Sequence, residues 1–332
     1  MKPLLALLGR LVCLALFAPL LAWASPAQAQ AGWPDKPIRW IIPYPAGGPL
    51  DAIGRKVADA VAAQIGQPIV IDNKTGAYGT LGAAEVVRSR ADGYTFLLSS
   101  GDTFINAMAL LKSPPYDARK DFTYLTQLAE SGAVLMLRGD AAETTLAELV
   151  AHAKAHPGQV SFGSWGPGSY THLLMEGLAR RTGADFLHVP YRGAMPAIQD
   201  LLGKQLVLTF GPANVAVNFA RQGNVKLLAV SGDRRSPLLP SVPTFEEAGY
   251  TDPVFRTRVW FGLAAPAGLP PAIADAMVKE VKLALAKPEV ARFIADAGFS
   301  AVGNTPAEFR KSFDAEYPLT IRMIRDAGVV PQ

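Results

Sequence analysis

The 332-residue chain has a single cysteine, Cys13, and it lies within the first 29 residues. Residues 1–29 have the pattern of a secretory signal peptide: two basic residues, an apolar stretch over Leu11–Ala24, and the small-x-small sequence Ala27-Gln28-Ala29. The stretch is shorter than the roughly 20 residues of a membrane-spanning helix, which favours a removed leader over a retained anchor. We therefore expect a periplasmic mature chain with no disulfide and no thiolate nucleophile.

Concentrated charge of either sign is also lacking. The chain has 32 basic and 28 acidic residues, and removing Lys2 and Arg10 leaves 30 against 28, a net charge of +2. No block of like charges and no second hydrophobic run of spanning length follow residue 29, so we expect neither a nucleic-acid partner nor membrane insertion. Of the four histidines, His152 and His156 are four residues apart, but without an H-E-x-x-H pattern they indicate a solvated helix face. We expect no metal and no cofactor.

Removing 29 of 332 residues leaves 303, which is enough for two domains. Short apolar runs that look like buried strands alternate with segments of helical spacing. This alternation predicts an α/β fold with parallel or mixed sheets covered by helices on both faces. The expected strands are Ile38–Ile42, Ile69–Ile71, Thr95–Leu98, Val134–Leu137, Val160–Phe162, Leu206–Phe210, Leu227–Val230 and Val259–Ala264.

Three segments have the sequence of a helix start. Thr145, Thr244 and Thr305 each precede a glutamate by three residues, the pattern of a capping box. A further helix is expected after Pro271, where apolar residues recur every four positions and indicate a face packed on the core. These apolar residues are Ile273, Met277, Val281 and Leu285.

The most informative segment, residues 43–51, follows the first expected strand and contains Gly47-Gly48. Adjacent glycines let backbone amides approach a ligand closely. A helix that begins at or near Asp51 would add free N–H groups and a dipole that favours an anion. The segment predicts a carboxylate or phosphate site that needs no cationic side chain. An ordinary tight strand-to-helix turn remains the alternative.

Similar glycine-rich turns follow two more strands, at residues 74–82 and 163–172. Ligands of open α/β sheets bind beyond the carboxyl ends of the strands, where all three turns are expected. Together they predict a pocket lined by amides and hydroxyls. None matches a nucleotide-binding motif, and Gly163-Ser164 lacks the pattern of a nucleophile elbow.

Two histidines, His172 and His188, are expected near this pocket, either as ligand contacts or as structural residues. Ser169 and His172, three residues apart, are the best candidate pair for a secreted hydrolase, but no third catalytic member is evident. The chain is therefore expected not to be an enzyme, with the hydrolase kept as an alternative.

The mature sequence resembles, over essentially its whole length, the Bug family of extracytoplasmic solute receptors of tripartite tricarboxylate transporters. The motifs that carry this resemblance are strong in their combined order and spacing. They are Pro45–Asp51, Asp72–Ala77 with Gly79 and Gly82, Asp92–Thr95, Pro115–Asp117, Gly166–Ser169 with His172, His188–Gly193, Ser241–Thr244 with Glu247–Gly249, and Trp260–Gly262 with Ala265–Gly268.

The resemblance implies a type II-like periplasmic binding protein that closes as a Venus flytrap on one organic acid. We expect lobe 1 to comprise residues 30–128 and 253–332, and lobe 2 residues 129–252, with crossings near Leu128 and Pro253. The family holds a carboxylate at the loop matching residues 44–51, opposite loops matching 166–169 and 99–103. The expected ligand-binding residues are Tyr44, Ala46, Gly47, Gly48, Asp51, Ser99, Ser100, Thr103, Gly166, Gly168, Ser169, His172, Tyr191 and Arg258.

Three departures from the family pattern bear on the ligand. Leu50 stands where many relatives have threonine, Gly211-Pro212 where many have an acid and an asparagine, and Arg258 where a small hydroxyl residue is common. Losing an acid and gaining a cation disfavours an ammonium group. The resemblance thus implies a monomeric receptor that delivers a non-amino mono- or dicarboxylate, aromatic acids included, to transporter subunits. A receptor for a signalling partner is the alternative.

Overall fold

The computed structural model describes residues 32–331, so the leader assigned to residues 1–29 lies outside the described residues. The fold below belongs to the compact unit that begins at Lys36, while residues 32–35 belong to a separate unit. Within residues 32–331, no helix combines the length and apolar character needed to span a membrane.

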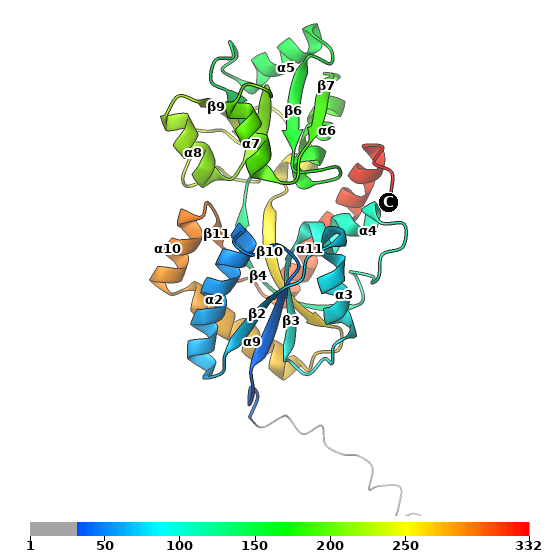
Figure 1. The fold of residues 1–332 in the computed structure, drawn as a ribbon, viewed down its shortest axis with the longest axis vertical. Helices are drawn as coiled ribbons and strands as arrows, with labels where there is room; N and C mark the ends of the chain where they lie inside the picture. The colour runs from blue at the N-terminus through cyan, green and yellow to red at the C-terminus, as the bar shows by residue number, and fades with distance from the viewer. Residues whose placement is uncertain (1–31, 332) are drawn as a thin grey trace, which may run out of the picture. The chain divides into compact units, whose positions relative to one another are not determined.

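Sheet A has six strands in the order β11-β4-β10-β3-β1-β2 (Figure 1). β1 pairs in parallel with β2 and β3, whereas β10 is antiparallel to both β3 and β4, so the sheet is mixed. Its strands are β1 (Ile38–Ile42), β2 (Ile69–Asn73), β3 (Thr95–Ser100), β4 (Phe122–Ser131), β10 (Val259–Pro266) and β11 (Ser300–Ala301).

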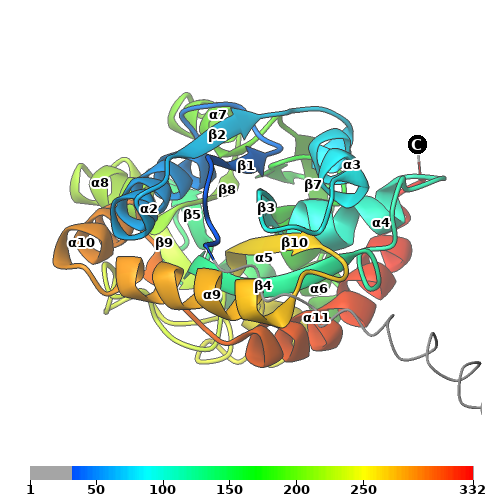
Figure 2. The ribbon, with the colours of Figure 1, turned by 90° about the horizontal axis from the view of Figure 1, so that it is seen from below.

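Helices cover both faces of sheet A, as the view in Figure 2 shows. One group consists of α2 (Pro49–Ile65), α9 (Pro271–Leu285) and α10 (Pro288–Asp296). The other consists of α3 (Thr80–Arg88), the π-helical turn η3 (Asp102–Asn106), α4 (Ala107–Leu110) and α11 (Pro306–Asp326), with the short turn η2 (Ala77–Gly79) before α3. Successive side chains of a strand face opposite sides, so Ile41 packs in the cluster under α3 and α11 while Ile42 lies near Gly54 of α2.

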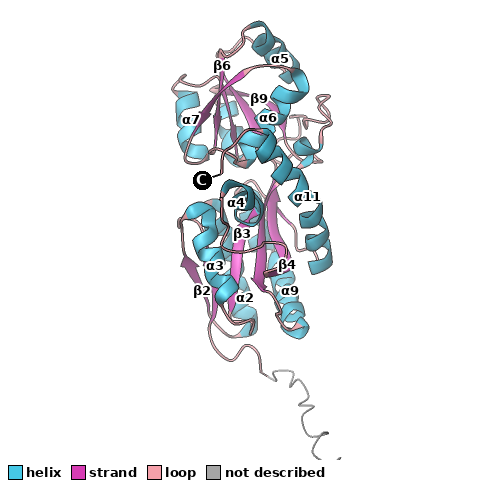
Figure 3. Ribbon diagram, turned by 90° about the vertical axis from the view of Figure 1, so that its right-hand side faces the viewer, coloured by secondary structure: helices cyan, strands magenta, loops and turns pink. Residues whose placement is uncertain are grey.

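Sheet B has five strands in the order β7-β6-β8-β5-β9, also mixed. Along β5 the same alternation divides the core: Leu135 and Leu137 pack with α5 and α6, and Val134 and Met136 with α7 and α8. Figure 3 shows helices on both faces of each sheet. The elements are β5 (Val134–Arg138), α5 (Leu146–Ala155), β6 (Val160–Ser164), α6 (Tyr170–Thr182), β7 (Phe186–Pro190), α7 (Ala194–Leu202), β8 (Leu208–Gly211), α8 (Ala213–Arg221), β9 (Val225–Val230) and η4 (Pro253–Arg256).

The chain leaves sheet A after β4, forms sheet B, and returns to sheet A with β10. Leu128 therefore lies inside β4 of sheet A, and the first strand of sheet B, β5, begins at Val134. We propose Gly132 as the first crossing and residues 257–258 as the second. The lobe boundaries remain predictions.

The structure confirms the capping boxes of Thr145 and Thr305, which begin α5 and α11. The prediction of a helix after Thr244 is wrong. Thr244 and Glu247 do exchange both hydrogen bonds of the box, but the chain forms a turn that ends at Gly249, whose φ of 94° is left-handed. The apolar face expected in α9 is confirmed, since Ile273, Met277, Val281 and Leu285 are all buried.

Candidate ligand-binding site

A cavity of about 420 Å³ lies between residues of sheet A and residues of sheet B. This volume is within the range of roughly 300–1,000 Å³ typical of small-molecule sites. Its lining residues are Tyr44, Pro45, Gly48, Pro49, Leu50, Asp51, Ser100, Asp102, Ser131, Gly132, Ala133, Trp165, Gly193, Ala194, Pro212, Val259, Phe261 and Phe299. Of the expected ligand-binding residues, the structure brings Tyr44, Gly48, Asp51 and Ser100 to this cavity.

Tyr44 ties the loop after β1 to the end of β3. Its hydroxyl lies 2.8 Å from Ser100 Oγ and 3.0 Å from Thr103 Oγ1, which in turn donates to the carbonyl of Tyr78. Burial, together with the charge of Asp102, raises the pKa of Tyr44 to about 12, so the hydroxyl is neutral. Thr103 is fully buried, so it can position the Tyr44 hydroxyl but does not itself line the cavity. Ser99 is also buried, and its Oγ has no hydrogen-bond partner in the part of the chain that the structure describes.

The carboxylate of Asp51 fixes the glycine loop. It accepts hydrogen bonds from the Gly47 N–H (2.9 Å), from Asn73 Nδ2 (2.9 Å) and from Arg55 Nε (3.0 Å). Burial alone would raise the pKa of Asp51, but these donors outweigh it and hold the pKa below its usual value. Gly47 has a φ of 85°, which a residue with a side chain adopts only with strain. Ala46 and Gly47 are exposed and do not line the cavity.

The first turn of α2 lies at the cavity and has free backbone donors. Gly48 is the N-cap and has no side chain to bond the turn, and Pro49, at N1, has no N–H. The N–H groups of Leu50 and Asp51 belong to the first turn, where no intrahelical acceptor exists. Both residues line the cavity. Free N–H groups favour an anion, and the positive end of the helix dipole favours it further.

The opposite wall comes from the carboxyl ends of strands in sheet B. Trp165 follows β6, Gly193 and Ala194 follow β7, and Pro212 follows β8. Trp165 is held by a hydrogen bond from its Nε1 to the Phe210 carbonyl (3.2 Å). Leu50, Ala133, Val259, Phe261 and Phe299 add apolar groups from elsewhere in the lining, so much of the cavity surface is apolar. Within the described residues, no lysine, arginine or histidine lines the cavity.

The loop Gly166–Ser169 lies beside this cavity rather than in its lining. His172 is buried and its Nδ1 accepts the Gly168 N–H (3.0 Å), so this ring holds the loop and is not free to act as a base for Ser169. Ser169 instead caps α6 by accepting the His172 backbone N–H. The Gly168 carbonyl accepts a hydrogen bond from Asn106 Nδ2 (3.0 Å), which links the loop to η3.

His188 also supports the loop Gly166–Ser169, through His172 and Ser164. Its ring stacks on His172 with a centroid distance of 4.0 Å, and its Nε2 lies 2.6 Å from Ser164 Oγ. Burial lowers the pKa of His188 to about 4, so its imidazole is neutral. Ser164 is itself fully buried and accepts the Gly166 N–H. This Ser-His contact is therefore a structural support for the loop.

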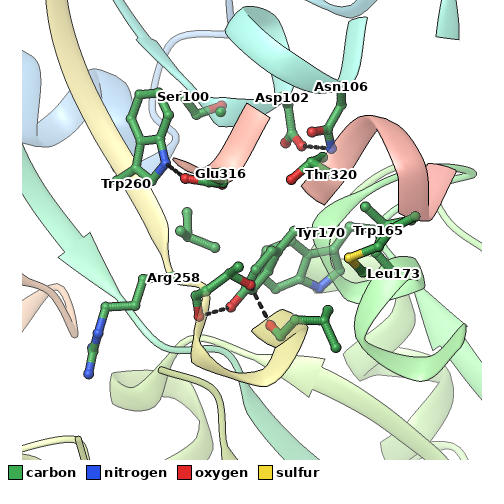
Figure 4. A pocket seen from close by; sticks show the side chains of 15 residues that line it. Ser100, Asp102, Asn106, Trp165, Tyr170, Leu173, Arg258, Trp260, Glu316 and Thr320 are labelled. Carbon is green, nitrogen blue, oxygen red and sulfur yellow. Dashed lines mark hydrogen bonds between the residues drawn. The ribbon is translucent and has the colours of Figure 1, made fainter. Parts of the chain in front are cut away.

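Two more expected residues contact protein groups instead of the cavity. The hydroxyl of Tyr191 donates to Asp200 Oδ2 (2.6 Å). The guanidinium of Arg258 bonds Asp233 Oδ1 (2.9 Å) and the Arg234 carbonyl (3.0 Å) and lies 3.6 Å from Glu130. Arg258 also lines a second, smaller hollow, and Figure 4 shows its guanidinium pointing away from that space.

Several of the lining residues were not expected from the sequence, and five of them show why. Trp165, Ala194 and Pro212 directly follow strands or the loops after them, so the rule that ligands bind at the carboxyl ends of strands could have found them. Ala133 and Phe299 carry no such signal, because only the approach of the two sheets brings them to the cavity.

Two mixed sheets with helices on both faces, a chain that passes from one sheet to the other and back, and a cavity between them define a two-lobed periplasmic binding protein fold. The comparisons agree. The chain resembles a solved structure of the periplasmic binding protein BugD, with a TM-score of 0.75 and 31% identity over 90% of this chain and 100% of that one.

Residues 53–328 match the family model described as tripartite tricarboxylate transporter family receptor, TctC. The chain is 33% identical to protein BugT of Bordetella pertussis (strain Tohama I) over 99% of this chain and 98% of that protein. A solved structure described as R. palustris Rpa4515 with adipate has a TM-score of 0.79 and 28% identity, covering 91% of this chain and 100% of that one. The chain belongs to the TctC (Bug) family of tripartite tricarboxylate transporter receptors, which are binding receptors and not enzymes.

Proposed function

We propose that this periplasmic receptor captures an organic carboxylate without an amino group and delivers it to the membrane subunits of a tripartite tricarboxylate transporter. The observation that carries the proposal is the uncapped first turn of α2, where Gly48, Leu50 and Asp51 face the cavity. Its free N–H groups suit a carboxylate, and they act without a cationic side chain. The relative with bound adipate supports the same ligand class.

The apolar part of the cavity lining supports an apolar ligand body. Leu50 is 5% exposed and Phe261 6%, and Trp165, Pro212 and Phe299 complete a surface with few polar groups. Pro212 supplies no carboxylate for a ligand ammonium group, and Asp51 already accepts hydrogen bonds from three donors, one of them the guanidinium of Arg55. An alkyl or aromatic acid fits these apolar walls, where an α-amino acid would find, among the described lining residues other than Asp51, only the Asp102 carboxylate for its ammonium group. Closure follows if the ligand contacts both lobes only in the closed form.

Calorimetric titration with adipate, malate, benzoate, aspartate and glutamate tests this proposal. We expect at least one of the three non-amino acids to bind with a Kd of about 10 μM or below, a binding free energy of about −7 kcal/mol. Aspartate and glutamate are expected to give no measurable heat. Tight binding of either amino acid would refute the assignment of ligand class.

A further inference from the structure

Behind the ligand cavity lies a second, smaller hollow of about 40 Å³ (Figure 4). It has room for very few water molecules, each of which needs at least about 10–15 Å³, and none for a metabolite. Ser100, Asp102, Trp165 and Val259 line both spaces, so the hollow adjoins the ligand cavity directly. Figure 4 shows Asp102 and Glu316 on one side of the hollow and Tyr170 and Trp165 on the other.

The two carboxylates in this hollow have only neutral hydrogen-bond donors among the contacts of the described residues. Asp102 accepts from Asn106 Nδ2 (2.8 Å), and Glu316 accepts from Trp260 Nε1 (2.8 Å). Arg258 is the cation that lines the hollow, and its guanidinium is bound to Asp233 and Glu130. Within residues 32–331, neither carboxylate is therefore neutralised by an ion pair.

Both acids are only partly exposed to solvent, and desolvation without a counter-ion favours the protonated form of each. Burial raises the pKa of Asp102 to about 6. Burial, with a further contribution from the charge of Asp102, raises the pKa of Glu316 to about 7, although the Trp260 hydrogen bond opposes it. The other titratable groups around the hollow are Tyr170 from α6 and Tyr44 from the loop after β1, and burial raises the pKa of each to about 12. Both tyrosines therefore stay neutral.

Asp102 is also connected to the opposite lobe. Its partner Asn106 donates to the Gly168 carbonyl, so one amide joins the carboxylate to the loop Gly166–Ser169. The π-helical turn η3 places both residues, because the N–H of Ala107 reaches the Asp102 carbonyl five residues back. A change of charge at Asp102 thus acts both on the ligand cavity and on a contact between the lobes.

We propose that Asp102 and Glu316 form a proton-binding site in the wall of the ligand cavity, and that the receptor takes up a proton when it captures an organic anion. The second part rests on the proposed function. An anion that enters beside Asp102 adds negative charge to a poorly solvated space, which raises the proton affinity of both acids. By linkage, anion affinity then rises as pH falls from about 8 to about 6.

The first part is tested without any ligand, by a carbon-13 NMR titration of the carboxyl groups with Asp102→Asn and Glu316→Gln as assignment variants. The pair is expected to titrate with apparent values near 6 and 7. Asp314→Asn, on the exposed face of α11, is the matched control and should leave both resonances unchanged. If both carboxyl groups titrate below about pH 5, as ordinary Asp and Glu do, the proposal is overturned.

The second part is tested by calorimetry with adipate in two buffers of different ionisation enthalpy. We expect the unsubstituted receptor to take up roughly 0.5–1 proton at pH 7 and to bind about 10-fold more tightly at pH 6 than at pH 8. The double variant should take up none and lose most of this pH dependence. Release of a proton would overturn the proposal, because the bound anion would then lower rather than raise the proton affinity of the pair. If adipate does not bind, the ligand class is at fault, and the NMR titration still decides on the proton site.

Discussion

Replacing Pro212 by aspartate is expected to weaken the binding of an organic carboxylate about 100-fold. Pro212 lines the cavity, so the substitution puts a second negative charge opposite the first turn of α2. Two like charges about 6 Å apart repel by about 3 kcal/mol at an effective dielectric constant of about 20. Calorimetry with adipate at pH 7.5 measures the loss.

The fold should tolerate this substitution. Pro212 is the N-cap of α8, with φ −62° and ψ 147°, where aspartate is among the favoured residues. Pro212→Asn has nearly the same shape and capping ability but no charge, and we expect it to change the affinity by less than about 3-fold on the same grounds. Equal losses in the two variants would show that shape rather than charge matters there, which contradicts an anion at this site.

Replacing Asp51 by alanine is expected to lower the free energy of unfolding by about 2–3 kcal/mol and to weaken ligand binding by at least about 10-fold. The change removes two part-buried hydrogen bonds that the carboxylate accepts, from the Gly47 N–H and from Asn73 Nδ2, and a hydrogen bond to a charged group contributes about 1.5–3 kcal/mol. Binding weakens because the loop before α2 is no longer held against the helix. Urea unfolding and adipate calorimetry measure the two effects.

Asp59→Ala is the matched control, since Asp59 lies on the same helix and is exposed. Its expected effect on stability is within about 0.5 kcal/mol. If Asp51→Ala binds adipate as well as the unsubstituted receptor, the loop does not need this carboxylate and the site must lie elsewhere.

Much of the fold follows from local patterns in the sequence. β1 has the predicted bounds, Ile38–Ile42, because its apolar run is bounded by prolines, and most other apolar runs became strands within a few residues of prediction. β4 was missed because Phe122–Ser131 mixes polar and apolar residues. β7 was missed because it is an edge strand, with Leu187 52% exposed. Neither has the continuous apolar run by which buried strands are identified.

The binding site was less predictable than the fold. The glycine turn before α2 could be predicted as a candidate site because it combines a strand end, two glycines and a helix start. The cationic role predicted for Arg258 depended on what surrounds it, and Asp233 and Glu130 come from distant parts of the chain. The proposed proton-binding site likewise could not be predicted from the sequence, because no sequence pattern brings Asp102 and Glu316 to the same hollow.

A crystal structure with the organic acid that binds most tightly in calorimetry tests the central claim most directly. We expect one ligand carboxylate within about 3.0 Å of the backbone nitrogens of Leu50 and Asp51, with the rest of the ligand against Trp165 and Pro212. A carboxylate paired instead with a cationic side chain such as Arg258, or a ligand outside the cavity between the sheets, would contradict the account.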